Sequence, residues 1–389
     1  MSTNERIFYA CQAVAIIPNG FPDTFLTTSH MVHGLQSVGI TTNFNLEQVF
    51  ELGQIEIYEN IEGTPDVEVT LEKVLDGSPL VYHLASSGVT GSPGGSGLSG
   101  RSKAQCDVRL GIFPDENNNV SAGGAAAEAE VQMSGMYISS VSYTLPVDGS
   151  ATESVTLVGN NKQWVVGGSI ANADVAAFDG TDGPAASGSD SHPSGGVQQR
   201  EDVLLSGSIL PRSIKGVVGN GYSNGFNTST KLPRVHLQNI SISTDFSRED
   251  ILELGKKTPY ARPATFPIEV TCEIEAITTS GDFVSAHEDG DYSLYSSAAS
   301  GNNTQEERIF IYTRGGFGFD LGVKDRLASI TYGGGDAGGG NATCTYSFSN
   351  FNDLDVQDRR NGYIGHEVLT FLSPGAKTRE FLFPADLIG

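Results

Sequence analysis

The feature of this 389-residue chain that most constrains its fold is an internal repeat. Residues 35–53 align without gaps on residues 237–255, and nine of the nineteen positions are identical. Most other positions exchange like for like, as Val38 does with Ile240. A long repeat of this kind indicates one structural unit used more than once, and the chain length accommodates two domains of about 150 to 190 residues. We therefore predict two copies of one domain.

The match continues downstream in the same order. After a shift of one residue, residues 65–72 align on residues 266–273. Further on, two similar strand segments are each followed by a glycine-containing turn and a second strand segment. This hairpin is predicted at Ser140–Tyr143 with Ser154–Asn161, and again at Ser329–Tyr332 with Thr343–Asn350.

The repeated unit has the pattern of strands. Residues 40–44 and 67–72 alternate apolar with polar side chains, which is the period of a strand with one buried face. The 48 glycines, 19 phenylalanines and 13 tyrosines favour short strands joined by turns over long helices. We predict a mainly β protein with two tandem homologous sandwich or barrel domains, each with a short helix and a long loop.

The short helix is expected between the first two repeated strands. Asn45 is placed to cap it, Gln48 occupies the capping-box position and Gly53 is placed to end it. The second copy repeats this arrangement with Ser247, Asp250 and Gly255. The alternative is a tight polar loop of the same length.

Three segments of biased composition set the expected boundaries. Residues 86–103 are rich in Gly and Ser, and residues 289–307 in Ser, Ala and Asn, so both are predicted to be long loops outside the core. Residues 167–199 contain four aspartates and no Lys or Arg, as expected for a linker or exposed insertion. The expected division is a first β domain at 1–166, a linker at 167–199, and a second β domain with a C-terminal extension at 200–389.

The charge balance limits the partners. The chain has 23 basic and 46 acidic residues, a net charge of −23. Such a surface repels a phosphate backbone, so tight DNA binding is not expected. The charge suits a protein that is simply kept soluble, and equally a wall past which DNA must slide.

The cysteines and the apolar runs bound the compartment. The four cysteines form no CxxC pair and are too sparse for a disulfide scaffold, so buried free thiols and folding in the cytosol are expected. The sequence contains no run of about 18 apolar residues, the length that a membrane-spanning helix needs. Residues 7–17 are predicted to form a strand, not a signal peptide.

Two glycine-containing motifs resemble those of enzymes. Residues 95–100 fit GxGxxG, but no helix pattern opens from this Ser/Gly-rich segment, as a phosphate site requires. Residues 221–225 fit GxSxG, yet turn-forming residues surround Ser223 where a nucleophile elbow needs a strand and a helix. A particle-bound hydrolase would need Ser223 with a distant partner such as His366.

Other polar groups also lack the context of a catalytic site. His30 and His33 have the spacing of two metal ligands on a helix, but turn-forming neighbours and the lack of a third ligand argue against a metal. Carboxylate pairs such as Glu51 with Glu56 are too common in so acidic a chain to indicate acid–base catalysis. We predict no enzyme activity, no catalytic, cofactor-binding or metal-binding residues, and no cofactor.

Each half of the chain resembles the tail-tube proteins of tailed bacteriophages. The likeness lies in the order of elements: an early strand, paired strands around a short helix, a long Gly/Ser loop, and a closing hairpin such as residues 136–146 with 153–158. It implies a sandwich or barrel of two sheets, rings that stack into a tube, and long loops that bridge rings. It also implies synthesis in the host cytoplasm, a place in the virion tail, and contact with tape-measure, baseplate and sheath proteins.

The resemblance also implies a stoichiometry and a lining. Family rings present six domains, so a chain with two would close as a trimer with pseudo-sixfold symmetry, its inner strands joined edge to edge, and DNA would pass without specific binding. The candidate lumen-facing residues are Glu68, Thr70, Glu72, Glu269, Thr271 and Glu273. The alternative for these residues is ordinary solvent exposure on an outer sheet. The alternative function for the chain is that of a capsid-decorating, baseplate or host-binding protein.

Overall fold

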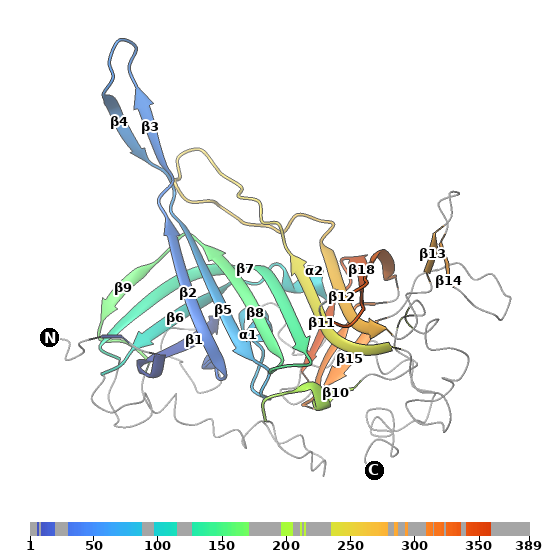
Figure 1. Ribbon diagram of the computed structural model, residues 1–389. Helices are drawn as coiled ribbons and strands as arrows, with labels where there is room; N and C mark the ends of the chain where they lie inside the picture. The colour runs from blue at the N-terminus through green and yellow to red at the C-terminus, as the bar shows by residue number, and fades with distance from the viewer. Residues whose placement is uncertain are drawn as a thin grey trace, which may run out of the picture.

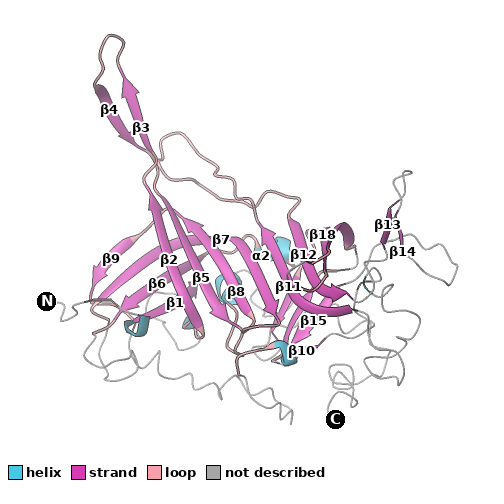
Figure 2. Ribbon diagram, in the orientation of Figure 1, coloured by secondary structure: helices cyan, strands magenta, loops and turns pink. Residues whose placement is uncertain are grey.

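The described part of the chain folds mainly as antiparallel sheet (Figure 1). Strands prevail in the described residues (Figure 2), which contain two short α-helices, so the prediction of a mainly β protein is confirmed. In the described part of the chain, no helix is long and apolar enough to cross a membrane. The computed structural model describes residues 6–7, 9–19, 30–87, 97–114, 127–170, 196–204, 211, 214, 235–278, 284–286, 292–294, 309–313, 315–322, 324–335 and 340–358.

Eight strands run side by side as the main sheet. Alternation of buried and outward side chains along each strand gives the sheet one buried and one outward face, as in β5, where Val67, Val69 and Leu71 are fully buried. In spatial order the strands are β17 (Arg326–Gly333), β18 (Thr343–Phe351), β12 (Glu269–Thr278), β11 (Val235–Asp245), β7 (Ala129–Pro146), β8 (Thr152–Gly159), β5 (Asp66–Val74) and β2 (Leu35–Asn43). Both predicted closing hairpins are present, as β7 with β8 and β17 with β18.

A second layer covers the buried face. In the first half its order is β1–β6–β7–β9, and in the second half β10–β15–β16–β19. Of the strand predicted at residues 7–17, the later part is present as β1, whereas residues 9–11 form the short 3-10 helix η1 (Tyr9–Cys11). The bounds are β1 (Gln12–Pro18), β6 (Cys106–Ile112), β9 (Gln163–Val166), β10 (Val203–Leu204), β15 (Phe310–Thr313), β16 (Phe317–Asp320) and β19 (Asp355–Asp358), with the 3-10 helix η5 (Arg200–Asp202) before β10.

Strand β7 joins the two layers of the first half. Its first part pairs with β6 and β9, and its second part pairs with β8 and β11. The register of its pairing with β6 shifts between Met133 and Met136, where Gly135 has a φ of 68° that favours glycine. In the second half the corresponding path is broken between β16 and β17.

One hydrophobic core continues through both halves, containing for example Leu71 and Val155 of the first and Ile274 and Phe348 of the second. The division at 1–166, 167–199 and 200–389 stays a prediction, since the halves share one sheet and one core. All four cysteines are buried and free, as predicted: Cys11, Cys106, Cys272 and Cys344.

Helix α1 (Val81–Ser86) is buried between the layers of the first half. The backbone amides of Val81 and Tyr82 donate to the Glu153 carboxylate at 2.7 and 3.2 Å, and the Tyr143 hydroxyl donates to it at 3.0 Å. Glu153 is fully buried, and this desolvation raises the pKa of its carboxyl group. Strand β8 therefore holds the helix start through one side chain.

The loop prediction for residues 86–103 is wrong at both ends of this segment. Leu98 and Arg101 are buried in the one-turn helix α2 (Leu98–Arg101), and the Arg101 guanidinium donates to the buried Ser86 hydroxyl at 2.7 Å. The segment thus contributes to the core through its ends, which its Gly/Ser-rich composition did not indicate. Most of residues 289–307 lie outside the described residues, apart from strand β14 (Tyr292–Leu294), which pairs with β13 (Val284–Ala286).

The expected helix after Asn45 is absent, and a hairpin takes its place. Strands β3 (Leu46–Phe50) and β4 (Ile57–Glu62) pair and project from the body (Figure 1). The Asn43 side chain accepts a hydrogen bond from the Asn45 backbone amide at 3.2 Å, and Asn45 has a φ of 48°, which is not helical. The β-branched and aromatic residues that follow favour a strand. We call residues 44–63 the first arm and residues 246–265 the second arm.

The second arm repeats the backbone of the first, 202 positions later. The pairs Leu46 with Glu62 and Val49 with Glu59 in the first arm correspond to the bridges Arg248 with Ala264 and Ile251 with Ala261. Ser247 has a φ of 43°, and its backbone amide donates a hydrogen bond to the Asp245 side chain at 2.8 Å, as in the first arm. Gly53 and Gly255 also both have positive φ, 97° and 88°. The helix expected at Ser247, Asp250 and Gly255 is therefore also wrong.

Strand pairing corrects one part of the sequence alignment. Ser37 pairs with Glu72, and its counterpart Asn239 pairs with Glu275. Glu72 therefore corresponds to Glu275 and not to Glu273, so the alignment of residues 65–72 on 266–273 is wrong by two positions. Because side chains alternate with a period of two, this shift leaves every side chain on the face that was expected.

Candidate assembly surface

The outward face of the main sheet carries all six candidate lumen residues. On both strands the carboxylates are exposed and the threonines are half-buried. Adjacent positions point into the core, so the alternation itself determines this placement. The residues are Glu68, Thr70 and Glu72 on β5, and Glu269, Thr271 and Glu273 on β12.

Hydroxyl groups dominate the rest of this face. One row of paired residues crosses six strands, from Ser349 through Thr271, Ser243, Ser142 and Ser154 to Glu72. Near the middle of the sheet this face has a hollow with a volume of about 590 Å³. Counted over the described outward positions of the eight strands, Arg326 is the one basic side chain. The face therefore offers hydroxyls and carboxylates, with little that would hold a phosphate.

The two halves meet where β11 pairs with β7, which we call the internal junction. The pairing is antiparallel, with Ile242 opposite Tyr143 and Ser243 opposite Ser142. Beneath it, the Tyr143 ring lies 4.6 Å from the ring of Phe319 on β16, so the second layer of one half supports the main sheet of the other. The Phe246 amide extends the pairing by donating to the Ser139 carbonyl at 2.8 Å.

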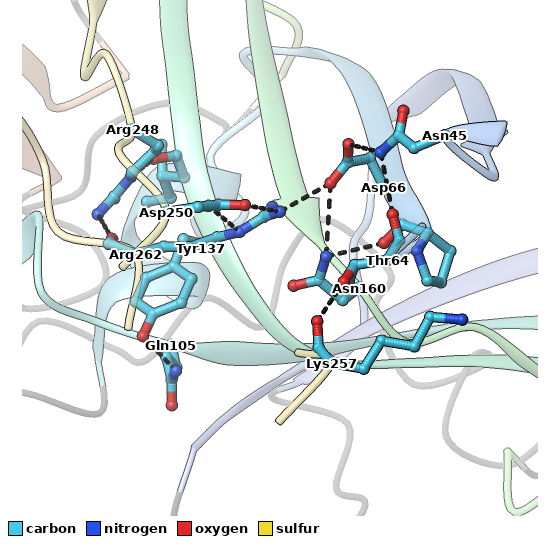
Figure 3. A network of polar contacts seen from close by, with 12 residues as sticks. Asn45, Thr64, Asp66, Gln105, Tyr137, Asn160, Arg248, Asp250, Lys257 and Arg262 are labelled. Atoms are coloured by element: carbon cyan, nitrogen blue, oxygen red, sulfur yellow. Dashed lines mark hydrogen bonds and ion pairs between the residues drawn. The ribbon is translucent and has the colours of Figure 1, made fainter. Parts of the chain in front are cut away.

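Arg248 at the base of the second arm reinforces the internal junction (Figure 3). Its guanidinium donates to the carbonyls of Ile138 at 2.8 Å, Ser102 at 2.6 Å and Arg262 at 3.0 Å. It also lies over the Tyr137 ring, 5.0 Å from its centroid. Burial lowers the pKa of Arg248 to about 10, so the side chain remains cationic at neutral pH.

Arg262 joins the second arm to the base of the first. Its guanidinium donates to Asp66 and to Asp250, each at 2.8 Å (Figure 3). The Asp66 carboxylate in turn accepts a hydrogen bond from the Asn45 side-chain amide at 2.6 Å, and the Thr64 hydroxyl donates to the Lys257 carbonyl. The two arms are therefore linked at their bases by a polar network of side chains.

The outer edges of the main sheet, β2 and β17, have no strand beside them in the described structure. Residues at these edges are more exposed than their counterparts at the internal junction. Phe44 is 60% exposed, whereas Phe246 is fully buried. Tyr332 on β17 is 53% exposed, whereas Tyr143 on β7 is 1% exposed. Exposed edges with apolar side chains are a pairing hazard unless a partner covers them.

Both arms also expose large apolar side chains, which the sequence analysis missed because it treated residues 45–53 as a helix. The β-branched and aromatic residues of segments 46–50 and 57–61, on either side of Gly53, were the signal that could have revealed a hairpin. The exposed side chains of the first arm are Phe44, Leu46, Phe50, Leu52, Ile55, Ile57, Tyr58 and Ile61, and those of the second are Ile251, Leu252, Leu254 and Tyr260.

The motifs considered for catalysis are not assembled into a site. Ser223, with the rest of residues 221–225, and His366 lie outside the described residues. The expectation that no helix opens from residues 95–100 is wrong, but α2 has only four residues. The His33 carbonyl accepts the buried Lys73 ammonium at 2.6 Å, and burial lowers the pKa of the His33 ring. No three His, Cys, Asp or Glu side chains in the described residues come together as a metal site.

No protein-family model matches the chain, and no curated protein matches it. Among solved structures, it is similar to a chain of the anti-feeding prophage baseplate, with 11% identity and a TM-score of 0.28 over 43% of this chain and 98% of that one. A chain of the anti-feeding prophage tube-terminating cap gives 12% identity and a TM-score of 0.29, covering 43% and 95%. A chain from the sheath–tube complex of an extracellular contractile injection system gives 11% and 0.29, covering 42% and 94%. Similarity at this level assigns no function.

Proposed function

We propose that this chain is a structural subunit of a phage tail tube, with three copies closing a ring and rings stacking into a conduit for the genome. The single observation that carries the proposal is the internal junction. There the two halves join head to tail in one continuous sheet, and the outer edges of that sheet remain open. A head-to-tail arrangement continues from chain to chain until the rotation closes a ring.

The dimensions fit such a ring. Each chain contributes eight strands to the main sheet, so three chains contribute twenty-four. At about 4.8 Å between strands, the circumference is at least about 115 Å and the barrel at least about 37 Å across, more once the strands tilt. In this trimer the two halves, as copies of one duplicated domain, take equivalent places and give pseudo-sixfold symmetry.

The outward face of the main sheet is proposed to line the lumen. Its carboxylates, Glu68, Glu72, Glu269 and Glu273 among them, would repel the DNA backbone, and its many hydroxyls carry no positive charge to retain it. The threonines Thr70 and Thr271 would face the lumen between them. The buried face and second layer would form the outer wall, so the protein would act without catalysis or a cofactor.

The arms are proposed to connect successive rings. They extend from one end of the main sheet and expose apolar side chains that a neighbouring ring would cover (Figure 1). A subunit of this kind would be made in the host cytoplasm and reside in the virion tail. Tape-measure protein would occupy the lumen, and baseplate and sheath proteins would contact the tube.

Electron microscopy of the purified chain over a concentration series tests this function. We expect hollow tubes or stacked rings with threefold or pseudo-sixfold end views. A variant lacking residues 47–61, which shortens the first arm at its base, is expected to form rings that stack poorly. Compact particles that never form rings at any concentration would instead favour a decorating, baseplate or host-binding protein.

A further inference from the structure

We propose that the junction between neighbouring chains copies the internal junction, with β2 of one chain pairing antiparallel to β17 of a second chain and Thr41 opposite Thr331. This inference rests on the proposed function and specifies its partner, a second copy of this chain, together with the edge and the register. We call this contact the interchain junction.

The first support is that each free edge matches one side of the internal junction. By the offset of 202 residues found in the arms, β2 corresponds to β11. By their common pairing with the next strand, β17 corresponds to β7, since Ser142 pairs with Ser154 as Thr331 pairs with Thr345. The main sheet therefore consists of two sets of four strands, β17–β18–β12–β11 and β7–β8–β5–β2, in the same order. The two sets join where β11 pairs with β7.

The second support is the pattern of exposure. Ile240 and Ile242 are buried against β7, whereas their counterparts Val38 and Ile40 are only half-buried. On the other side, Val141 is 2% exposed and its counterpart Ile330 is half-buried. Apolar side chains thus remain on both free edges at the positions that the internal junction covers. Each edge has the surface that the other requires.

The register follows by transferring the pairs of the internal junction. Ile242 opposite Tyr143 becomes Ile40 opposite the partner's Tyr332, and Ser243 opposite Ser142 becomes Thr41 opposite the partner's Thr331. The bond from the Phe246 amide to the Ser139 carbonyl becomes one from Phe44 to the carbonyl of the partner's Ala328. Phe44 would then be buried as Phe246 is.

The two junctions differ in their polar contacts. Arg248 and Arg262, whose guanidinium groups join the halves within one chain, correspond to Leu46 and Asn60 in the first arm. Tyr137, which lies beneath Arg248, corresponds to Arg326. The interchain junction therefore keeps the strand pairing and the apolar contacts but lacks both buried arginines of the arm. It is therefore the weaker of the two junctions.

A cysteine cross-link tests the register. Because Phe246 with Ser139 is a hydrogen-bonded pair, Ser243 with Ser142, three residues along, is a non-hydrogen-bonded pair with Cα atoms about 4.5 Å apart, within disulfide range. We would prepare Thr41→Cys and Thr331→Cys as separate chains and oxidise them alone and mixed. The native cysteines can stay, because all four are buried.

Two controls match this pair. Ser142→Cys with Ser243→Cys in one chain should form an intrachain disulfide, which shows that the geometry supports cross-linking. Thr41→Cys mixed with Ser329→Cys is two residues out of register, with Cα atoms about 7–8 Å apart, and should not cross-link.

We expect disulfide dimers in the Thr41→Cys and Thr331→Cys mixture and at least tenfold less in either chain alone. Dimers of Thr41→Cys with itself, or equal yield from the out-of-register pair, would overturn the proposal. So would the absence of dimers in a sample whose rings are visible by microscopy, although the proposed function would then stand. Absence of both rings and dimers would overturn both, whereas dimers without stacked rings would retain the junction and reject the tube.

Discussion

Phe246 and Phe44 occupy the same position in two copies of one sequence motif, yet the first is fully buried and the second is 60% exposed. Both follow a strand of the main sheet and precede a residue with positive φ. Phe246 has β7 beside it, whereas Phe44 lies at the open edge next to β2. The comparison teaches that burial at this position is provided by a neighbour, which one half finds within the chain and the other does not.

The arms differ in the same way. The first arm is held by its own strand ladder, β3 with β4, while the second has only two isolated bridges. The second arm instead rests on the first half through Arg248 and Arg262. A segment whose contacts lie across a junction needs less internal pairing, which explains how similar sequences give a regular hairpin and an irregular one.

The largest effect is expected from Phe246→Ala. The change removes a fully buried ring from the internal junction, and large-to-small changes of this kind cost about 3–5 kcal/mol of unfolding free energy. Urea denaturation followed by tryptophan fluorescence measures the loss. A loss below about 1 kcal/mol would show that the junction contributes little to stability and would break the comparison with Phe44.

Arg248→Leu gives the second arm the residue that the first arm carries at Leu46. Three carbonyls lose a charged donor whose hydrogen bonds contribute about 1.5–3 kcal/mol each, but the change also removes the cost of burying the Arg248 cation, so we expect a net loss of about 2–3 kcal/mol. Denaturation of the free chain measures it. The matched variant, Leu46→Arg, changes an exposed side chain and should leave the same curve unmoved; equal losses in both would contradict the difference between the arms.

The break between β16 and β17 predicts a pH dependence of the free energy of unfolding. Asp325 is fully buried there, and burial, with Asp353 and Asp320 nearby, raises its pKa to about 8. Between about pH 4, where an unfolded aspartate titrates, and pH 8, the folded chain binds a proton that the unfolded chain releases, so stability falls as pH rises. We expect the melting temperature to drop by several degrees from pH 5 to pH 8.

Asp325→Asn isolates this contribution from the general repulsion among carboxylates. The variant should lose part of the pH dependence and gain stability relative to the parent chain at pH 8. Glu130→Gln, which changes a buried acid in the first half on β7, serves as the comparison. An unchanged slope in Asp325→Asn would exclude the buried aspartate as its source.

The smallest effect on the free chain is expected from Phe44→Ala, within about 0.5 kcal/mol, as is usual for exposed positions. The same change should raise the protein concentration needed for ring formation about tenfold or more, because the ring is buried only in the assembly. Sedimentation of the parent and the variant over a dilution series measures this. An unchanged threshold would show that Phe44 stays outside the interchain junction.

Much of the sheet could be predicted from the sequence. Alternation in residues 67–72 placed Val67, Val69 and Leu71 inside and Glu68, Thr70 and Glu72 outside, because the period of two is a local property of the strand. The alignment of residues 65–72 was two positions out because short alternating motifs match equally well when moved by one period. The helix after Asn45 was wrong because capping residues also begin turns, and here the Asn43 side chain binds the Asn45 amide.

By itself the sequence determined that the chain is mainly β, which face the side chains of residues 67–72 take, and that one pattern occurs twice. Only the tertiary structure decided that β11 lies beside β7 and that β2 and β17 stay open. The physical reason is that edge pairing uses backbone hydrogen bonds, which every strand offers alike. The choice of edge depends on packing between distant segments, such as Tyr143 against Phe319, and no local pattern encodes that contact.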